Sequence, residues 1–281
     1  MQGSYCERTA FWVYYNEPIF IGSFCLYKIK LRGIIVLRGD IMERFKRNEY
    51  AFSKSGVEKL KNSSVCVLGV GGVGSFAVES LARSGIGKLI IVDKDTVDIT
   101  NINRQIHANT NTIGRDKVEV MKERIALINP DCEVTALKMF YLPEQREKLF
   151  EHKFDFLIDA CDTVTAKIDV IKECLKRDIK FISSMGAGNK FDPTMFEITD
   201  ITKTSYDPLA KVIRQKLRKE KVFGKVPVIY SKEEPKEPFH DHIGESEIRK
   251  EAIPPSSNSF VPSTVGLIAT SYVVRKILEE L

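Results

Sequence analysis

A glycine-rich hexapeptide, GVGGVG, follows a short apolar run and opens a segment with helical spacing. Three of its glycines fit the pattern G-x-G-x-x-G and a fourth lies between them: Gly69, Gly71, Gly74 and Gly72. Glycines let a backbone approach a phosphate closely, and a helix N-terminus offers free N–H groups and the positive end of a dipole. Asp93 ends the next apolar run, about 20 residues on, where a carboxylate can accept hydrogen bonds from ribose hydroxyls. The pattern predicts a nucleotide site.

Charged residues downstream of the glycine loop indicate whether the bound nucleotide is a triphosphate or a dinucleotide. A dinucleotide needs only its pyrophosphate held, whereas a nucleoside triphosphate needs several cations and usually Mg²⁺. Arg104 and Lys117 lie where the chain returns toward the carboxyl ends of the predicted strands, and Asp162 directly follows the apolar run FDFLIDAC. Ligands of doubly wound sheets bind at that edge. The combination favours ATP, with Asp95 and Asp162 as candidate magnesium ligands.

Four segments together resemble the ubiquitin-activating-like (E1-like) adenylating superfamily, which includes the bacterial activators of sulfur-carrier proteins. They are GVGGVG, DKDTVDITNINRQ, Lys117 and DACDT, and the resemblance covers most of residues 43–190. The element D-x-D…N-x-x-R-Q is far more specific than the glycine loop. The resemblance implies an enzyme that adenylates a carboxylate with ATP and Mg²⁺.

The resemblance also implies a role for each matching residue. Asp93 would hold the ribose, Lys117 would neutralise triphosphate charge, and Asp162 would hold or position Mg²⁺. Three residues of one segment would contact the phosphates: Asn101, Arg104 and Gln105. In relatives an arginine from the N-terminal helix of the second subunit reaches the triphosphate, and Arg47 in RFKRNEY matches it. A homodimer with composite sites is therefore implied.

The C-terminal part is similar to the tRNA threonylcarbamoyladenosine dehydratase branch of the superfamily. The similarity rests on ITKTSYDPLAKVIRQKLRKEKV, PVIYSKEEP and SFVPSTVGLIATSYVV. It implies adenylation of the carboxylate of threonylcarbamoyladenosine in tRNA, followed by ring closure with net loss of water. Sulfur-carrier activators usually bear two C-x-x-C zinc pairs, and thioester-forming relatives use a cysteine downstream of Cys174; this chain has neither. A sulfur-transfer or redox partner protein stays open.

A basic segment, residues 203–225, agrees with an RNA substrate. Its eight basic and two acidic residues leave +6, more than the +5 of the whole chain. Asp207, Pro208 and Gly224 suit the N-cap, the first turn and the stop of a helix. One face would be apolar and buried: Leu209, Val212, Ile213 and Leu217. The other face predicts contacts with tRNA phosphates, from Lys211, Arg214, Lys216, Arg218 and Lys219. On composition alone, a solvated lysine-rich helix is an equal alternative.

Alternating strands and helices would position these residues. Strands are predicted at 65–68, 88–93, 132–139, 154–160 and 179–184, with helices at 72–84, 115–129 and 164–176 between them. Continuous apolar strands that alternate with helices indicate an α/β fold, a Rossmann-like doubly wound and mostly parallel sheet. A mobile loop at 231–259 and an apolar-faced helix from Ser263 complete the chain.

Three segments follow from this pattern. Residues 1–41 are aromatic-rich without a clear helical or strand period, and we expect the working protein to begin at Met42. Residues 42–200 are predicted to form the ATP-binding adenylation domain. Residues 201–281 are predicted to form a substrate- and tRNA-binding segment packed on the same domain.

Composition excludes few classes of protein. The chain is 43% hydrophobic and 29% charged, as in ordinary globular proteins. Six cysteines without a C-x-x-C pair indicate reduced thiols in a cytoplasmic protein. No run reaches the roughly 18 apolar residues of a membrane span.

Three rival functions stay open from the sequence. The first is activation of the C-terminus of a sulfur-carrier protein, which shares the chemistry. The second is an NAD-dependent oxidoreductase, disfavoured by Arg104 with Lys117. The third is a nucleotide-bound RNA-binding scaffold without turnover, disfavoured by the intact set of charged site residues.

Overall fold

The structure is a computed structural model that describes residues 17–21, 24–31, 34–37, 43–237, 239 and 255–279. The chain divides into two compact units, Met1–Arg47 and Asn48–Leu281. Each unit is described by itself.

The first unit contains an antiparallel three-stranded sheet, β1 (Glu17–Ile21), β2 (Phe24–Leu31) and β3 (Ile34–Leu37). The sequence predicts no element in residues 1–41, so this sheet is a correction. Two residues separate each pair of strands, Gly-Ser and Arg-Gly. A glycine-containing pair between apolar runs is a hairpin signal that a search for long periods misses. Where the working protein begins stays a prediction.

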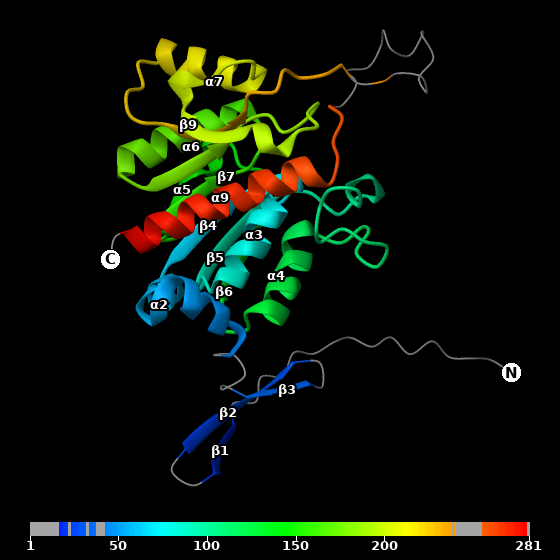
Figure 1. Cartoon of the computed structure of the whole chain (residues 1–281), viewed down its shortest axis with the longest axis vertical. Coiled ribbons are helices and arrows are strands. Elements are labelled where there is room, and N and C mark those ends of the chain that lie inside the picture. Colours follow the sequence, from blue (N-terminus) through cyan, green and yellow to red (C-terminus); the bar gives the residue numbers. More distant parts are fainter. Residues whose placement is uncertain are drawn as a thin grey trace, which may run out of the picture. The chain divides into compact units, whose positions relative to one another are not determined.

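The second unit is built on a seven-stranded sheet with the order β6-β5-β4-β7-β8-β10-β9 (Figure 1). Its strands are β4 (Ser64–Leu68), β5 (Lys88–Asp93), β6 (Glu133–Lys138), β7 (Phe156–Asp159), β8 (Lys180–Ser184), β9 (Phe196–Asp200) and β10 (Pro227–Ser231). All neighbouring pairs are parallel except β9 with β10. The predicted doubly wound, mostly parallel α/β fold is confirmed.

Helices cover both faces of the sheet because alternate strand residues point to opposite sides. Val65 and Val67 face the core that includes α3 (Gly72–Ser84), α4 (Lys117–Ile128) and α9 (Phe260–Glu279). Cys66 and Leu68 face the core that includes α5 (Arg146–Phe150), α6 (Val164–Arg177) and α7 (Pro208–Lys219). Both strand faces are apolar, which is why the strands read as continuous apolar runs.

Another helix, α2 (Lys46–Lys61), spans the boundary between the units and packs Leu60 into the first of these cores. Its helical path is interrupted at Ser53, where φ is 67°. Among the described residues, no helix is long and apolar enough to cross a membrane.

The structure corrects three sequence predictions in the C-terminal part. Val212 is 38% exposed instead of buried. Helix α7 ends at Lys219, before Gly224. Lys221 takes the left-handed conformation at φ 54°, and the N–H groups of Lys221 and Val222 bond to carbonyls of the last turn. This is the Schellman arrangement, with lysine where glycine is usual.

The third correction concerns the two ends of residues 231–259, predicted as a mobile loop; residues 238 and 240–254 lie outside the described residues, where this stays a prediction. Ser231 ends β10, and the buried Glu233 accepts hydrogen bonds from the N–H groups of Phe191 and Asp192. Near the other end, Ser256 and Asn258 bond to Asn189 and Lys190. The two described ends of this stretch are therefore fixed by tertiary hydrogen bonds, which its polar composition concealed.

Helices α3 and α9 cross in close contact (Figure 1). A Cβ added to Gly266 would lie 2.4 Å from the carbonyl oxygen of Val73 and 2.9 Å from the N atom of Ala77. Thr270 of α9 donates a hydrogen bond to the carbonyl oxygen of Ala77, at 3.1 Å. The approach of the two backbones therefore requires glycine at position 266.

Replacing Gly266 with alanine should destabilise the protein, because the new methyl group forces two packed helices apart. Overpacking of this kind costs about 1–3 kcal/mol. Urea unfolding followed by circular dichroism measures the loss. Leu267→Ala, at a neighbouring position that is 49% exposed, is the control and should change the free energy of unfolding by less than about 0.5 kcal/mol. Equal stability of the two variants would contradict the packing argument.

Candidate active site

The glycine loop between β4 and α3 forms one wall of a cavity of about 390 Å³. Gly69 has a φ of 90°, and a Cβ there would lie 2.8 Å from the carbonyl oxygen of Ala160. A Cβ on Gly74 would lie 1.7 Å from the carbonyl oxygen of Gly69. Gly71 caps α3 without a side-chain hydrogen bond, and a Cβ there would meet nothing within 4 Å. Gly71, Gly72 and Val73 line the cavity, so the first turn of α3, whose N–H groups have no partner within the helix, lies at this site as in anion-binding loops.

Asp93 ties this loop to the end of β5. One carboxylate oxygen accepts a hydrogen bond from the N–H of Val70, at 2.7 Å, and the other accepts from the N–H of Asp95, at 2.8 Å. Asp93 also lines the cavity. The carboxylate thus fixes the loop and retains lone pairs for hydroxyl donors.

The segment after β5 brings three predicted residues to the cavity: Asn101, Arg104 and Gln105. A capping box at Asp98 and Asn101 starts a short 3-10 helix, Ile99–Asn101. Arg104 Nη1 donates to the carbonyl oxygen of Thr100 at 2.7 Å and to Asn103 Oδ1 at 2.9 Å. Its side-chain stem lies 3.6 Å from where a Cβ of Gly72 would be. Arg104 is therefore held over the start of α3.

Gln105 provides a test of whether the cavity fits a polar ligand. The residue is 5% exposed and lines the cavity, and its Oε1 has no hydrogen-bond partner among the described residues. Buried acceptors without a partner are costly and rare. A ligand with an N–H or O–H donor would satisfy this oxygen.

Lys117 begins α4 and is buried at the cavity, where its Nζ lies 3.2 Å from Asp95 Oδ2. The side chain of Lys117 is 7% exposed, whereas that of Asp95 is 49% exposed. Lys117 therefore places one buried positive charge at the cavity, and its partner faces the solvent.

Asp162 lies on the opposite side of the glycine loop, after β7. It is exposed, lines the cavity and accepts a hydrogen bond from Thr163 at 3.3 Å. Behind it, Asp159 Oδ2 is fully buried and pairs with Lys167 Nζ at 3.0 Å and with Ser183 Oγ at 2.6 Å. Burial and the nearby Asp159 raise the pKa of the Cys161 thiol well above its ordinary value. Cys161 therefore lines the cavity as a thiol and not as a nucleophilic thiolate.

The structure brings most predicted cofactor-site residues together. Those that line the cavity are Gly69, Gly71, Gly72, Asp93, Asp95, Asn101, Arg104, Gln105, Lys117 and Asp162. Gly74 is buried beneath the loop. Arg47 is exposed, belongs to the first unit and is not among the cavity residues.

Of the predicted tRNA contacts, four are exposed on α7: Lys211, Lys216, Arg218 and Lys219. Arg214 differs, because its guanidinium donates to the carbonyl oxygens of Ile201, at 3.1 Å, and Thr204, at 3.3 Å, and to Thr204 Oγ1. Arg214 thus fixes the approach to α7, and its predicted contact with RNA stays a prediction.

Sequence reasoning missed the part of the cavity that comes from distant segments: Ala187, Gly188, Ser257 and Pro262. Asn103, beside Arg104, donates to the carbonyl oxygen of Ser257 at 3.1 Å. Asn189 Oδ1 accepts from the N–H of Ser256 at 2.7 Å. The local signal for this part of the cavity is the segment Gly186-Ala187-Gly188, because two glycines directly after a strand indicate a second loop at this edge of the sheet.

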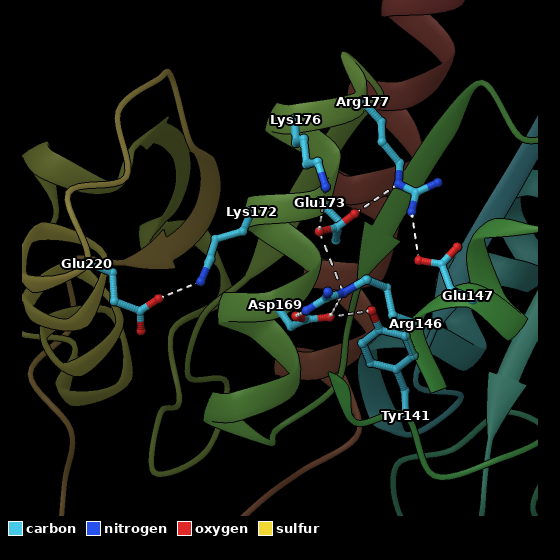
Figure 2. A network of polar contacts seen from close by, with 9 residues as sticks. All are labelled: Tyr141, Arg146, Glu147, Asp169, Lys172, Glu173, Lys176, Arg177 and Glu220. Carbon is cyan, nitrogen blue, oxygen red and sulfur yellow. Dashed lines mark hydrogen bonds and ion pairs between the residues drawn. The ribbon is translucent and has the colours of Figure 1, made fainter. Parts of the chain in front are cut away.

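A further cavity residue, Tyr141, opens a polar network that crosses α6 (Figure 2). Its hydroxyl donates to Asp169 Oδ2 at 2.7 Å, and burial with the Asp169 carboxylate raises the pKa of Tyr141. Asp169 also pairs with Arg146. The remaining members form ion pairs along the outer side of α6 and reach the end of α7: Glu147, Lys172, Glu173, Lys176, Arg177 and Glu220. The network fixes one wall of the cavity.

Residues 45–280, most of the chain, match the ThiF family. The chain belongs to the ThiF family. It is 57% identical over 246 residues to the tRNA threonylcarbamoyladenosine dehydratase of Bacillus subtilis, with 86% of this chain and 97% of that protein covered. The crystal structure of the E. coli tRNA N6-threonylcarbamoyladenosine dehydratase TcdA in complex with ATP superposes with a TM-score of 0.79 at 33% identity, over 88% of this chain and 98% of that one.

Adenylyltransferases of the ThiF family are more distant. A probable molybdopterin-synthase adenylyltransferase of Porphyra purpurea is 40% identical over 123 residues, 43% of this chain and 31% of that protein. The predicted resemblance to the E1-like superfamily, and within it to the dehydratases, is confirmed.

His107, two residues after Gln105, is buried and does not line the cavity. It is 1% exposed, and neither ring nitrogen has a partner among the described residues. Burial, followed by the charges of Lys117 and Arg124, lowers its pKa to about 4. The imidazole is therefore neutral at neutral pH.

This lowered pKa predicts a pH dependence of stability. Below pH 6.5 His107 binds a proton in the unfolded chain but stays neutral in the folded chain. Protonation therefore stabilises the unfolded state, and the free energy of unfolding falls as the pH falls from 6.5 toward 4. Between pH 7 and pH 5 the loss should be about 2 kcal/mol. Urea unfolding at the two pH values of the wild type and of His107→Leu measures it. The same pH dependence in both proteins would contradict the assignment.

Proposed function

We propose that this chain is an ATP-dependent tRNA threonylcarbamoyladenosine dehydratase that acts in the cytoplasm. It adenylates the carboxylate of threonylcarbamoyladenosine in tRNA, and ring closure follows with net loss of water. The observation that carries the proposal is the convergence of the glycine loop, Arg104 and Lys117 on one cavity. It occurs in a chain that matches a dehydratase over nearly that protein's whole length.

The cavity suits ATP as the second substrate. The first turn of α3, with Arg104 and Lys117, would hold the phosphates, because N–H groups and cations converge there. Asp93 would accept hydrogen bonds from the ribose hydroxyls, and Asn101 and Gln105 would complete the contacts. Support comes from the ATP present in the structure of TcdA.

Mg²⁺ would bind at Asp162. Among the described residues, no group of three or more metal-binding side chains converges. Mg²⁺ is usually held by one or two carboxylates together with substrate phosphates and water, so a single exposed carboxylate fits it. When bound, the ion would screen the charge of the triphosphate.

The chemistry needs positioning more than acid–base groups. An oxygen of the substrate carboxylate bonds to the α-phosphorus of ATP, the bond to the bridging oxygen breaks, and pyrophosphate leaves. A nucleophile of the same side chain then attacks the activated carbonyl carbon, and AMP leaves with the oxygen that the nucleoside loses. Ring closure within one side chain profits from high effective molarity. No electrons or sulfur atoms are exchanged, so this step needs no redox or sulfur-transfer partner.

The tRNA would bind along α7. Seven cations of residues 203–225 are exposed: Lys203, Lys211, Lys216, Arg218, Lys219, Lys221 and Lys225. Phosphate contacts of this kind dominate RNA affinity and weaken with salt. The N-cap Asp207 accepts a hydrogen bond from Gly186, whose neighbours Ala187 and Gly188 line the cavity. The helix therefore begins beside the cavity edge.

The decisive assay is ATP–pyrophosphate exchange with tRNA that carries threonylcarbamoyladenosine, together with the mass of the product nucleoside. The wild type should exchange with this tRNA and reduce the nucleoside mass by one water. Arg104→Ala should lower the exchange rate by at least about 100-fold, because a cation that stabilises the phosphoryl transition state is lost. Its tRNA affinity should stay within about twofold of the wild type, because Arg104 lies outside the α7 surface.

Arg115→Ala is the matched control, because Arg115 belongs to the same segment but pairs with Glu123 outside the cavity. It should keep wild-type exchange. Normal exchange by Arg104→Ala would show that the site is wrong. Exchange by the wild type only with a sulfur-carrier protein would replace the substrate by the alternative.

We also propose a homodimer in which Arg47 of one copy reaches the cavity of the other. The resemblance supports this proposal, and Arg47 is exposed as it requires. Ile99 and Ile102, which are 65% and 42% exposed, flank Asn101 and give this segment apolar surface to bury.

A composite site predicts complementation between two inactive proteins. Arg47→Ala and Arg104→Ala should each be inactive alone. When subunits are mixed and allowed to exchange, heterodimers contain one intact site, and about a quarter of wild-type activity should return. Mixing Arg104→Ala with Asp162→Asn is the control, because each subunit's own cavity then carries a defect and no intact site can form. Failure of the Arg47 pair to regain activity, or return of activity in the control pair, would contradict the composite site.

A further inference from the structure

Two aromatic side chains stand out on the basic segment because they are exposed at opposite ends of α7. Tyr206 is 64% exposed and precedes the helix, and Phe223 is 86% exposed and follows it. The helix has 12 residues and therefore spans about 18 Å.

The turn after α7 holds Phe223 outward. The N–H of Val222 bonds to the carbonyl oxygen of Leu217 at 2.9 Å, and Val222 packs into the core beneath the helix. Gly224 follows with a φ of 140°, and a Cβ there would lie 2.8 Å from Leu175 Cδ2. Because both neighbours are pinned against the protein, the ring between them is directed away from it.

The turn before α7 does the same for Tyr206. Tyr206 has a φ of 54°, a conformation that a bulky side chain rarely adopts without strain. The next residue, Asp207, is drawn inward, where it caps Ala210 and pairs with the buried Lys190 at 3.2 Å. The backbone thus accepts strain while the phenol stays in solvent.

Exposed cations lie close to both aromatic residues in the sequence. Lys221 and Lys225 flank Phe223, and Lys203 and Lys211 flank Tyr206 along the chain, all of them exposed. Between the rings, Lys211, Arg218 and Lys219 recur at helical spacing along one stripe of α7. Aromatic faces set in a basic surface are how proteins bind unpaired nucleic acid, because every base can stack on a ring while the backbone phosphates contact cations.

We propose that Tyr206 and Phe223 are stacking platforms for unpaired bases of the RNA that lies along α7. The inference rests on the proposed function for the identity of that RNA as tRNA, and it adds the residues that select an unpaired stretch. Tyr206 would act at the end of α7 beside the cavity edge, and Phe223 would bind a second base of the same RNA at the other end of the helix.

The test compares aromatic and charge variants of the full chain in binding a fluorescein-labelled stem-loop RNA with an unpaired loop. Phe223→Ala and Tyr206→Asn should each weaken binding at least about fivefold, as expected for one lost stack. Asparagine is chosen at position 206 because it tolerates a positive φ. The slope of log affinity against log salt should not change, because no charge is removed. Neutralising Lys216, Arg218 and Lys219 together should reduce that slope instead.

Two controls sharpen the comparison. Leu127→Ala removes a side chain that is 59% exposed on α4, on the other face of the sheet, and should leave affinity unchanged. Phe223→Trp, in a Trp12→Phe background that removes the chain's one tryptophan, should restore affinity and lose fluorescence when RNA is added. If the aromatic variants bind the stem-loop like Leu127→Ala, the stacking proposal is wrong.

The outcome is separable from that of the proposed function. A wild type that dehydrates tRNA while the aromatic variants bind RNA normally would overturn the stacking platforms alone. A wild type that does not dehydrate tRNA, yet binds the stem-loop through Tyr206 and Phe223, would support the platforms and overturn the enzyme assignment.

Discussion

The candidate active site, at the carboxyl ends of the parallel strands, depends on how closely α3 approaches the end of β4. Gly74 allows that approach, because a Cβ there would lie 1.7 Å from the carbonyl oxygen of Gly69. Gly69 in turn presses against Ala160, which follows β7. Only with the helix start in this place can Asp93 reach the N–H of Val70, and only then do the free N–H groups of α3 face the cavity. The same placement carries α3 against α9, so the loop geometry extends through the fold to Gly266.

Two buried ion pairs hold the rest of this edge. Asp159 with Lys167 lies behind β7, and Asp207 with Lys190 joins the loop after β8 to the start of α7. Burying such pairs costs nearly as much as their attraction returns, so they are weak sources of stability. The pairs instead fix the positions of neighbouring segments. Lys167, for example, also donates a hydrogen bond to the carbonyl oxygen of Ser184 at the end of β8, at 2.7 Å. Because Lys167 and Lys190 are fully buried with carboxylates, the cations that line the cavity and can face a ligand are Lys94, Arg104 and Lys117.

The sequence could predict the parts of the fold that repeat and the parts of the site that are local. Strands buried on both faces must be apolar throughout, and ligands collect at their carboxyl ends, so the glycine loop, Asp93, Arg104 and Lys117 could be placed together. Ser257 and Pro262 could not, because a hydrogen bond from Asn103 across 154 residues leaves no local pattern. Val212 was misplaced because periodicity locates a face only approximately. Lys221 concealed a helix stop because glycine is the residue expected there.

An enzyme that binds two polyanions at once must keep them on separate cations. The cations of the α6 network do not serve either purpose, because Arg146, Lys172 and Arg177 are each matched by a carboxylate (Figure 2). Lys117 is recessed in the cavity and paired with Asp95, so a small phosphate chain can reach it and an RNA backbone cannot. The exposed lysines of α7 show the opposite arrangement, open to a large polymer and outside the cavity. The cavity thus binds a small anion through recessed cations, and α7 binds a polymer through exposed ones. Asp207 connects the two regions, because it begins α7 and accepts a hydrogen bond from Gly186 at the cavity edge.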